Sequence, residues 1–444
     1  MKMKNTLALS MIVRDAEEQL GDCLSSCREL VDEIVIGDTG SRDRTISIAK
    51  SFGATVVTLP WMDDFAAARN AVLHSVETDW VLVLDADELL DPDARTNLRT
   101  HLQNRAVAGY QVAIRNYVTS LNERLWDQPA RRNDSTLERV RSYPAFVEHQ
   151  NVRLFRRDPR IRFEGRVHET VGRRILSAGF KLERSEFCIH HLGMTASQEN
   201  RARKNLLYRR LGIEKIKEMP DDAQAHFELG LVELDNFANL EGALELFRKT
   251  RLLNSRFQQA WFFEGVTLAR LERFSEAIVC LRQSEKAGLR TALVAEVLGD
   301  TYYNLGKFDD SARMFRISLT RSKDHLRVES KLGLALVRDG QSKSGLEHLK
   351  NAVLCAPADP ELHDRLLQAF VSLNQFDNAA AVADSKLEAT LQPASADFLR
   401  AAALWFQLGR LARSAAILEV GLQMYPREET LRKGLEQLAR HNSD

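Results

Sequence analysis

The sequence predicts two domains of different class: an α/β domain with a mostly parallel sheet, followed by an all-helical array of repeats. In the first part, apolar runs rich in Val, Ile and Leu alternate with helix-like segments, a pattern typical of β-α-β units with right-handed crossovers. In the second part, small residues recur every 34 residues, the period of stacked helix hairpins. With 444 residues, the chain is long enough for both domains and leaves little over.

The α/β domain is expected to begin with four strands separated by three helices. Their order is strand 7–13, helix 15–30, strand 32–37, helix 45–52, strand 54–59, helix 64–76 and a last strand from residue 80. Gly40 permits a tight turn after the second strand. In an open parallel sheet the ligand binds beyond the C-terminal ends of the strands. We therefore expect Asp38 and Asp85, at two of these ends, to lie near a bound nucleotide.

The fourth strand ends in three carboxylates, which is the most informative feature of the sequence. Asp85, Asp87 and Glu88 follow an apolar run over residues 80–84. Side chains two apart on a strand share a face, so Asp85 and Asp87 are expected to point at one cation. Mg²⁺ and Mn²⁺ favour carboxylate and phosphate oxygens, which suits departure of a nucleoside diphosphate. A solvated acidic turn is the alternative, and a calcium loop is disfavoured because Leu90 replaces the Gly that such a loop needs.

Arginines are the expected anion-binding groups. Arg69 is well placed for a diphosphate, because guanidinium binds phosphate oxygens bidentately; a salt bridge to Asp63 or Asp64 is the alternative. The segment 131–174 holds 12 Arg, no Lys and 6 acidic residues, although the whole chain has 62 basic and 62 acidic residues. This local excess favours a site for an anionic group over general nucleic-acid binding, and a solvated basic surface remains the alternative.

Residues 6 to about 195 resemble family 2 glycosyltransferases with the GT-A fold. The matching segments are Leu9–Val13, Val35–Thr45, Trp61–Asn70 and Asp79–Glu88. Their order and spacing are similar to the subgroup of bacterial peptide S-glycosyltransferases and lipopolysaccharide-core transferases. The resemblance implies inverting transfer from a nucleotide sugar, usually UDP-linked, with Mn²⁺ or Mg²⁺. It also implies that Asp38 lies at the nucleoside, Asp85 near the ribose or metal, and Asp87 on the metal.

Two departures from the family pattern concern nucleotide binding. Many members have two consecutive aspartates where this chain has Asp38 and Thr39, so the second base contact is in doubt. Asn-Glu commonly follows the first strand, whereas Asp15 and Ala16 stand here.

The segment Phe163–Glu169 is similar to the part of these enzymes that closes the acceptor side. Inverting transfer needs a general base on the acceptor, for which Glu169 is the candidate, and His168 is a candidate diphosphate contact. Pairing of Glu169 with an arginine is the alternative. A thiol acceptor would need a weaker base, because cysteine is already partly thiolate. The sequence from His190 to Gly193 is similar to a closing His-x-Gly element, so that His191 is a candidate metal ligand and packing is the alternative.

The second half resembles tetratricopeptide repeats (TPRs). Ala243, Ala277, Ser311, Gly345 and Ala379 are spaced 34 apart, and Gly230, Gly265, Gly299 and Gly333 recur at nearly the same period. We expect a transferase domain over 1–198, a helical connector over 199–222, and about six repeats over 223–444, the last ones degenerate. Solenoids of this kind bind extended peptides or helices, so the repeats are expected to hold a polypeptide acceptor; a dimer interface or a purely structural buttress is the alternative.

The apolar runs and the cysteines predict where in the cell the protein is found. No apolar run approaches the roughly 20 residues of a membrane span, and the amino terminus is needed as a strand rather than as a signal peptide. The five cysteines are scattered without zinc-site spacing, which favours reduced thiols in the cytoplasm.

Three functions follow from these expectations. The favoured one is a metal-dependent, inverting glycosyltransferase that uses a UDP-sugar to modify a protein or peptide. The second transfers sugar to a lipopolysaccharide core or another surface glycan. The third is a non-catalytic repeat scaffold with a relic transferase domain.

Overall fold

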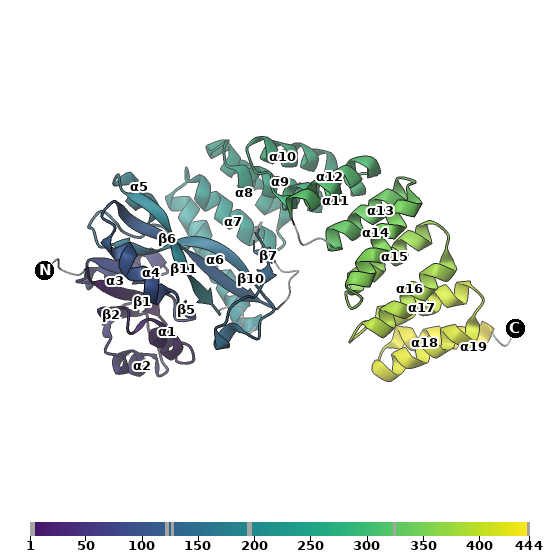
Figure 1. Ribbon diagram of the computed structural model, residues 1–444, viewed down its shortest axis with the longest axis horizontal. Helices are drawn as coiled ribbons and strands as arrows, with labels where there is room; N and C mark the ends of the chain where they lie inside the picture. The colour runs from purple at the N-terminus through teal and green to yellow at the C-terminus, as the bar shows by residue number, and fades with distance from the viewer. Residues whose placement is uncertain (1–4, 120–123, 126–127, 193–197, 323–325, 442–444) are drawn as a thin grey trace. The chain divides into compact units, whose positions relative to one another are not determined.

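The computed structural model describes residues 5–119, 124–125, 128–192, 198–322 and 326–441. The chain divides into two compact units, Met1–Asn239 and Leu240–Asp444. An α/β domain comes first and a helical array follows, as the sequence predicts (Figure 1). None of the helices in the described ranges combines the length and apolar character that a membrane crossing requires.

The first unit is built on one mixed sheet with the order β3-β2-β1-β4-β10-β6-β11-β5. These strands are β1 (Leu7–Val13), β2 (Glu33–Asp38), β3 (Thr55–Thr58), β4 (Trp80–Val83), β5 (Glu88–Leu90), β6 (Val107–Val118), β10 (Ala145–Arg156) and β11 (Lys181–His191). Strands β1 to β4 are mutually parallel, as expected. Strand β10 runs antiparallel to both β4 and β6, and β11 is antiparallel to β5. The sheet is therefore parallel in its N-terminal half and mixed beyond β4.

Short elements complete this sheet. Strand β9 (Arg131–Arg132) pairs with β10, and β7 (Arg124–Leu125) pairs with β8 (Gln128–Pro129). A single 3₁₀ turn covers Glu138–Val140.

The helices of the first unit follow the expected order at its start. They are α1 (Leu20–Cys27), α2 (Thr45–Ser51), α3 (Phe65–His74), α4 (Ala94–Gln103), α5 (Gly172–Ser177), α6 (Gln198–Glu218) and α7 (Ala223–Asp235). Helix α3 begins after Asp64, whose carboxylate accepts a hydrogen bond from the Ala67 amide at 2.8 Å. Helix α1 begins later than residue 15, because Asp15 has a left-handed φ of 49° and the chain turns before Leu20. Leu7, Leu9 and Met11 of β1 are completely buried in the core.

The second unit consists of helices packed in sequence. They are α8 (Leu240–Leu253), α9 (Gln258–Arg270), α10 (Phe274–Lys286), α11 (Ala292–Asn304), α12 (Phe308–Arg321), α13 (Leu326–Arg338), α14 (Ser342–Cys355), α15 (Pro360–Ser372), α16 (Phe376–Ala389), α17 (Ser395–Gln407), α18 (Leu411–Met424) and α19 (Glu429–His441). Each packs on the next along the chain, which is the stacking of a TPR array. The first compact unit ends at Asn239, and the domain borders expected at residues 198 and 222 stay predictions.

The periodic glycines occur where the helices of a hairpin approach closely. A Cβ atom added to Gly265 would lie 2.7 Å from Leu281, and one added to Gly299 would lie 2.5 Å from Phe315. The same residue spacing recurs at Gly333, whose added Cβ would lie 2.8 Å from Leu349. The 34-residue period therefore reflects a repeated contact between a bare helix backbone and a large side chain sixteen positions later.

Candidate active site

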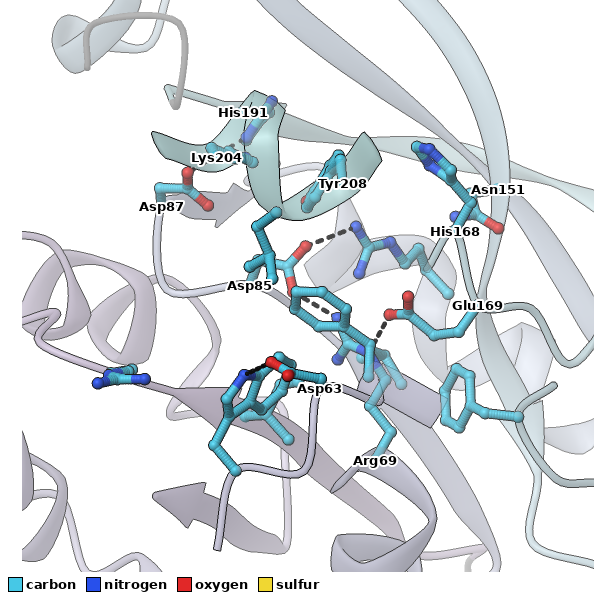
Figure 2. Close-up of a pocket in the computed structure, with 18 of the residues that line it drawn as sticks. Asp63, Arg69, Asp85, Asp87, Asn151, His168, Glu169, His191, Lys204 and Tyr208 are labelled. Atoms are coloured by element: carbon cyan, nitrogen blue, oxygen red, sulfur yellow. Dashed lines mark hydrogen bonds and ion pairs between the residues drawn. The ribbon is translucent and has the colours of Figure 1, made fainter. Parts of the chain in front are cut away.

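A cavity of about 890 Å³ opens in the first unit. Its walls come from the ends of β1 and β4, from β10, from the segment before α5, and from α6 (Figure 2). Among the predicted site residues, Arg69, Asp85, Asp87, His168, Glu169 and His191 line it. Long-range folding thus brings together six of the seven residues singled out in the sequence.

Arg69 is held between two carboxylates at the floor of this cavity. Its Nη2 lies 2.6 Å from Asp85 Oδ1, and its Nε donates to Glu169 Oε1 at 2.5 Å (Figure 2). The Arg69 side chain is 7% exposed, and that of Glu169 is 14% exposed. Asp63 and Asp64, the partners considered from the sequence, are engaged elsewhere. In this conformation Arg69 therefore binds two carboxylates of the protein and not a phosphate.

Arg153 of β10 completes this charge network. Its Nη2 lies 3.0 Å from Asp85 Oδ2 and 2.7 Å from Glu88 Oε1. Burial by itself raises the pKa of Asp85, but Arg153 and Arg69 lower it more, so that its pKa falls well below the usual range. Burial raises the pKa of Glu88 even though Arg153 pairs with it. The Asp85 carboxylate is thus kept ionised between two guanidinium groups.

Asp87 and His191 form a separate pair at the rim. His191 Nε2 lies 3.3 Å from Asp87 Oδ2, and its Nδ1 contacts Asn116 Oδ1 at 2.8 Å. Burial lowers the pKa of His191, but the Asp87 carboxylate raises it more, so that the pKa lies above its usual value. An imidazole and a carboxylate facing one another are suited to share either a proton or a divalent cation.

In this conformation Asp85 and Asp87 face different partners, and their binding of one cation stays a prediction. Strand β4 ends at Val83, and Asp87 lies in the turn before β5, so the alternation of a strand does not align the two carboxylates. Asp85 is drawn to Arg69 and Arg153, whereas Asp87 faces His191.

Helix α6 closes the cavity with residues that the sequence analysis missed. Arg203, Lys204, Leu207, Tyr208 and Arg210 all line it. Lys204 Nζ lies 5.5 Å from the centroid of the Tyr208 ring, and the described residues place no carboxylate within ion-pair distance of it. Tyr208 also contacts the His168 ring, with centroids 5.6 Å apart. The helix carried no motif, and its high charge was the only signal in the sequence.

Two residues of the cavity wall have left-handed backbone conformations that non-glycine residues rarely adopt. Asp63 has φ 55° and His168 has φ 53°. Asp63 accepts a hydrogen bond from Trp61 Nε1 at 2.8 Å and pairs with Arg210 Nη2 at 2.8 Å. Strained backbone of this kind persists where surrounding contacts hold it, often at functional sites.

Parts of this chain are similar to known proteins. The family model "Glycosyl transferase family 2" matches residues 9–162. A TPR repeat-containing protein of Synechococcus elongatus is 38% identical over 171 residues, which cover 38% of this chain and 36% of that protein. An uncharacterized glycosyltransferase of Rickettsia typhi is 30% identical over 108 residues, covering 23% of this chain and 36% of that protein. The prophage-derived glycosyltransferase SunS of Bacillus subtilis is 22% identical over 266 residues, covering 59% of this chain and 57% of that protein.

The first unit contains a family 2 glycosyltransferase domain, at residues 9–162. In this chain it is joined to a TPR array, as the sequence predicts. The chain spans between about a third and somewhat over half of the length of these relatives.

Asp38 is the one predicted site residue of this transferase domain that does not line the cavity. It is 2% exposed at the end of β2, and its carboxylate accepts hydrogen bonds from the amides of Gly40 and Ser41. In this conformation it fixes the turn after β2. His190 is fully buried, unlike its neighbour His191, and Gly193 lies outside the described residues.

Many arginines of the arginine-rich segment of the transferase domain pair with carboxylates of the protein. Besides Arg153, which pairs with Asp85 and Glu88, five of its side chains are engaged in ion pairs: Arg139 with Asp22, Arg160 with Asp158, Arg166 with Glu218, Arg173 with Asp222 and Arg174 with Glu164. Of the segment's arginines, Arg153 is the one that lines the cavity.

Proposed function

We propose that the protein transfers a sugar from a nucleotide-sugar donor, UDP-linked, to a polypeptide acceptor, with inversion at the anomeric carbon. The observation that supports this most is the convergence of the Asp87–His191 pair and unpaired basic side chains on one cavity in a family 2 domain. A relic transferase domain would have no need to keep these groups together.

Asp87 and His191 are the residues that would hold a divalent cation. Oδ2 and Nε2 face each other at 3.3 Å, and Asn116 orients the ring through Nδ1. A carboxylate with an imidazole suits Mn²⁺ better than Mg²⁺, which prefers oxygen ligands alone. A cation bound there would neutralise charge on the departing diphosphate. Asp85 stays a predicted contact of the ribose or the metal, and it would have to leave an arginine to serve.

Lys204 is the cation of the described cavity that we assign to the diphosphate. Arg69 and Arg153 are already neutralised by carboxylates, whereas no carboxylate in the described part of the chain forms an ion pair with Lys204. An unpaired ammonium is available for charge that develops as the leaving group departs. His168, the residue directly before Glu169, is proposed to contact the same diphosphate.

Glu169 is the proposed general base. Its Oε1 accepts the hydrogen bond from Arg69, which orients the carboxyl, and we assign Oε2 to the proton of the acceptor. A thiol acceptor would ask less of this carboxylate than an alcohol, because the thiol loses its proton more readily.

Donor hydrolysis tests the first part of this proposal. We would measure UDP release from a panel of UDP-sugars with Mn²⁺, for wild type, Asp87→Ala and Lys204→Ala. Both variants are expected to lose at least about 100-fold in rate, the typical cost of removing one group that stabilises transition-state charge. Asp93→Ala, an exposed carboxylate outside the cavity, should match wild type. Unchanged release by Asp87→Ala would overturn the metal assignment, and release from no UDP-sugar would overturn the donor.

The acceptor is proposed to be a polypeptide held by the TPR array. The alternative, a lipopolysaccharide core or another surface glycan, is expected to use the arginine-rich segment, but six of its twelve arginines already pair with carboxylates. Sugar incorporation into peptide libraries and into purified glycans distinguishes these acceptors, and NMR of the product's anomeric configuration tests inversion. Incorporation into glycan alone would reverse the choice. A cytoplasmic location and a homodimer remain predictions.

A further inference from the structure

We propose that Asp91, Cys188 and His190 bind one Zn²⁺ ion, at a site separate from the cavity. Among the described residues, these three form a group whose potential ligand atoms all lie within 4.8 Å of one another. None of the three lines the cavity. The site supplies a thiolate, an imidazole and a carboxylate, the ligand types that zinc accepts together.

The cluster follows from the pairing of two strands. In the antiparallel β5–β11 pair, Leu90 lies opposite Ile189 and Leu89 opposite His190. One position further, the amide of Asp91 donates to the carbonyl of Cys188 at 3.1 Å. Opposite residues share a face, as do residues two apart. Asp91, Cys188 and His190 therefore stand on one face, and His191 stands on the other, toward the cavity.

The distances between the ligand atoms fit a tetrahedral ion. Cys188 Sγ lies 3.5 Å from Asp91 Oδ2 and 3.9 Å from His190 Nε2, and Nε2 lies 2.8 Å from Oδ2. Zinc–ligand bonds of about 2.3 Å to sulfur and about 2.0 Å to nitrogen or oxygen place neighbouring ligand atoms about 3.3 to 3.5 Å apart. Shifts of about half an ångström would complete the geometry.

The surroundings orient His190 as a ligand. Its Nδ1 contacts the hydroxyl of Tyr117 at 2.7 Å, which leaves Nε2 for the ion. Metal-binding histidines are usually anchored in this way through the second ring nitrogen. On the opposite face, Asn116 anchors Nδ1 of His191 in the same manner. Adjacent residues of β6 thus prepare adjacent histidines of β11, each with its Nε2 facing an aspartate.

Charge and access also agree with a bound zinc ion. Binding would release the thiol proton of Cys188 to solvent, and the resulting thiolate and the Asp91 carboxylate together balance the two positive charges. His190 would keep one proton, on Nδ1, donated to the Tyr117 oxygen. The Asp91 side chain is 18% exposed while His190 is fully buried, so one side remains open for a water molecule as fourth ligand.

Such an ion would stabilise the strand pair that carries the cavity's own Asp–His pair. Asp87 directly precedes β5, and His191 ends β11. Linking Asp91 to Cys188 and His190 would fix the spacing of these two strands. The ion would thereby act as a structural brace and take no part in sugar transfer.

Cobalt substitution tests the site in the full-length protein. After chelator treatment, Co²⁺ titration of wild type should give a thiolate-to-cobalt charge-transfer band that saturates at one equivalent and is abolished by Zn²⁺. Cys188→Ser should lack the band. Cys355→Ser, which removes an exposed cysteine, and Asp87→Ala should both retain it. A band that persists in Cys188→Ser, or no band in wild type, would overturn the proposal.

Asp91→Asn covers the case in which Cys188→Ser does not fold. The amide keeps the shape of the side chain and a hydrogen-bonding oxygen but removes the ligand charge. Its apparent affinity for Co²⁺ should fall at least about tenfold, the loss seen even for partners outside the ligand set. Zn²⁺ should raise the Tm of wild type and of Cys355→Ser more than that of Asp91→Asn. Equal affinity and an equal rise in Tm for Asp91→Asn would contradict the site.

Discussion

Arg69 neutralises two carboxylates at the floor of the cavity. It pairs with Asp85 and Glu169 while being 7% exposed itself. Removing one partner of a buried ion pair leaves the other charge uncompensated. We expect Arg69→Ala to lower the free energy of unfolding of the transferase unit by about 3 kcal/mol, measured by calorimetry. Arg69→Lys should recover only part of this, because an ammonium cannot reproduce the guanidinium fork.

The matched control for Arg69 is Arg44, which pairs with Glu17 at 3.1 Å and is 81% exposed. Arg44→Ala should cost less than about 1 kcal/mol, since exposed ion pairs contribute little. Equal losses of unfolding free energy for Arg44→Ala and Arg69→Ala would show that the buried ion pairs stabilise the protein no more than the exposed one.

The sequence indicated which residues meet, but not which of them pair. Asp87, His191, Arg69 and Glu169 were found because strand ends and family-like motifs mark them. Their partners depend on side-chain packing across the sheet, so a pattern local to the chain could not assign Asp85 to two arginines. Asp38 illustrates the same limit, because its carboxylate binds two amides only two and three residues away, a turn that competes with any ligand.

At the scale of the elements, Asp222 both caps helix α7 and links it to helix α5. Asp222 caps α7 by accepting from the Gln224 amide at 2.9 Å, and both of its oxygens bind Arg173 at 2.9 and 3.0 Å. Burial raises the pKa of Asp222, but the Arg173 hydrogen bonds lower it more, so that its pKa lies below the usual value.

The downward shift in the pKa of Asp222 makes its contribution depend on pH. A carboxyl group with a lowered folded-state pKa stabilises the protein above its unfolded pKa of about 3.9, and this stability is lost as the pH falls through the folded value. We expect Asp222→Asn to lower the free energy of unfolding by about 1 kcal/mol at pH 7 and by progressively less below about pH 4. Asp221→Asn, at an exposed neighbour, is the control. A difference that is constant from pH 7 to pH 3 would argue against the ionic origin.

In the helix pair α15–α16, the small and the large residue of the glycine contacts have changed places relative to the earlier hairpins. Positions equivalent to Gly333 and Leu349 are Leu367 and Ala383, 34 residues later, and both are buried. The large side chain therefore sits on the first helix rather than the second. Leu367→Ala should cost about 2 to 4 kcal/mol by leaving a cavity, and Ala383→Leu about 1 to 3 kcal/mol by overpacking. The variant that carries both changes should be more stable than the sum of the two losses predicts. Calorimetric unfolding of the repeat unit would measure this. Strictly additive losses would contradict the exchange of small and large residues between the two helices.

At the scale of the whole molecule, the two fold classes were predictable because each depends on a period in the sequence. Strand-helix alternation and the 34-residue repeat can be recognised in the sequence without knowing how the side chains pack. The mixed half of the sheet was not predictable in this way, because β6, β10 and β11 pair across long stretches of chain. The part that α6 plays in the cavity was not predictable for the same reason, because its contacts there lie outside any local pattern.

The place of α6 in the first unit leads to a prediction about where the chain can be divided. A fragment that ends at Asn239 keeps Lys204 and Tyr208 on the cavity wall, whereas one that ends at residue 198, the border expected from the sequence, removes both. By calorimetric titration with UDP and Mn²⁺, the first fragment should bind within about threefold of the full chain, a difference of less than 1 kcal/mol. The second should bind at least about tenfold more weakly, because it lacks the ammonium group assigned to the diphosphate. Circular dichroism must show that both are folded, and equal affinities of the two folded fragments would remove α6 from the site.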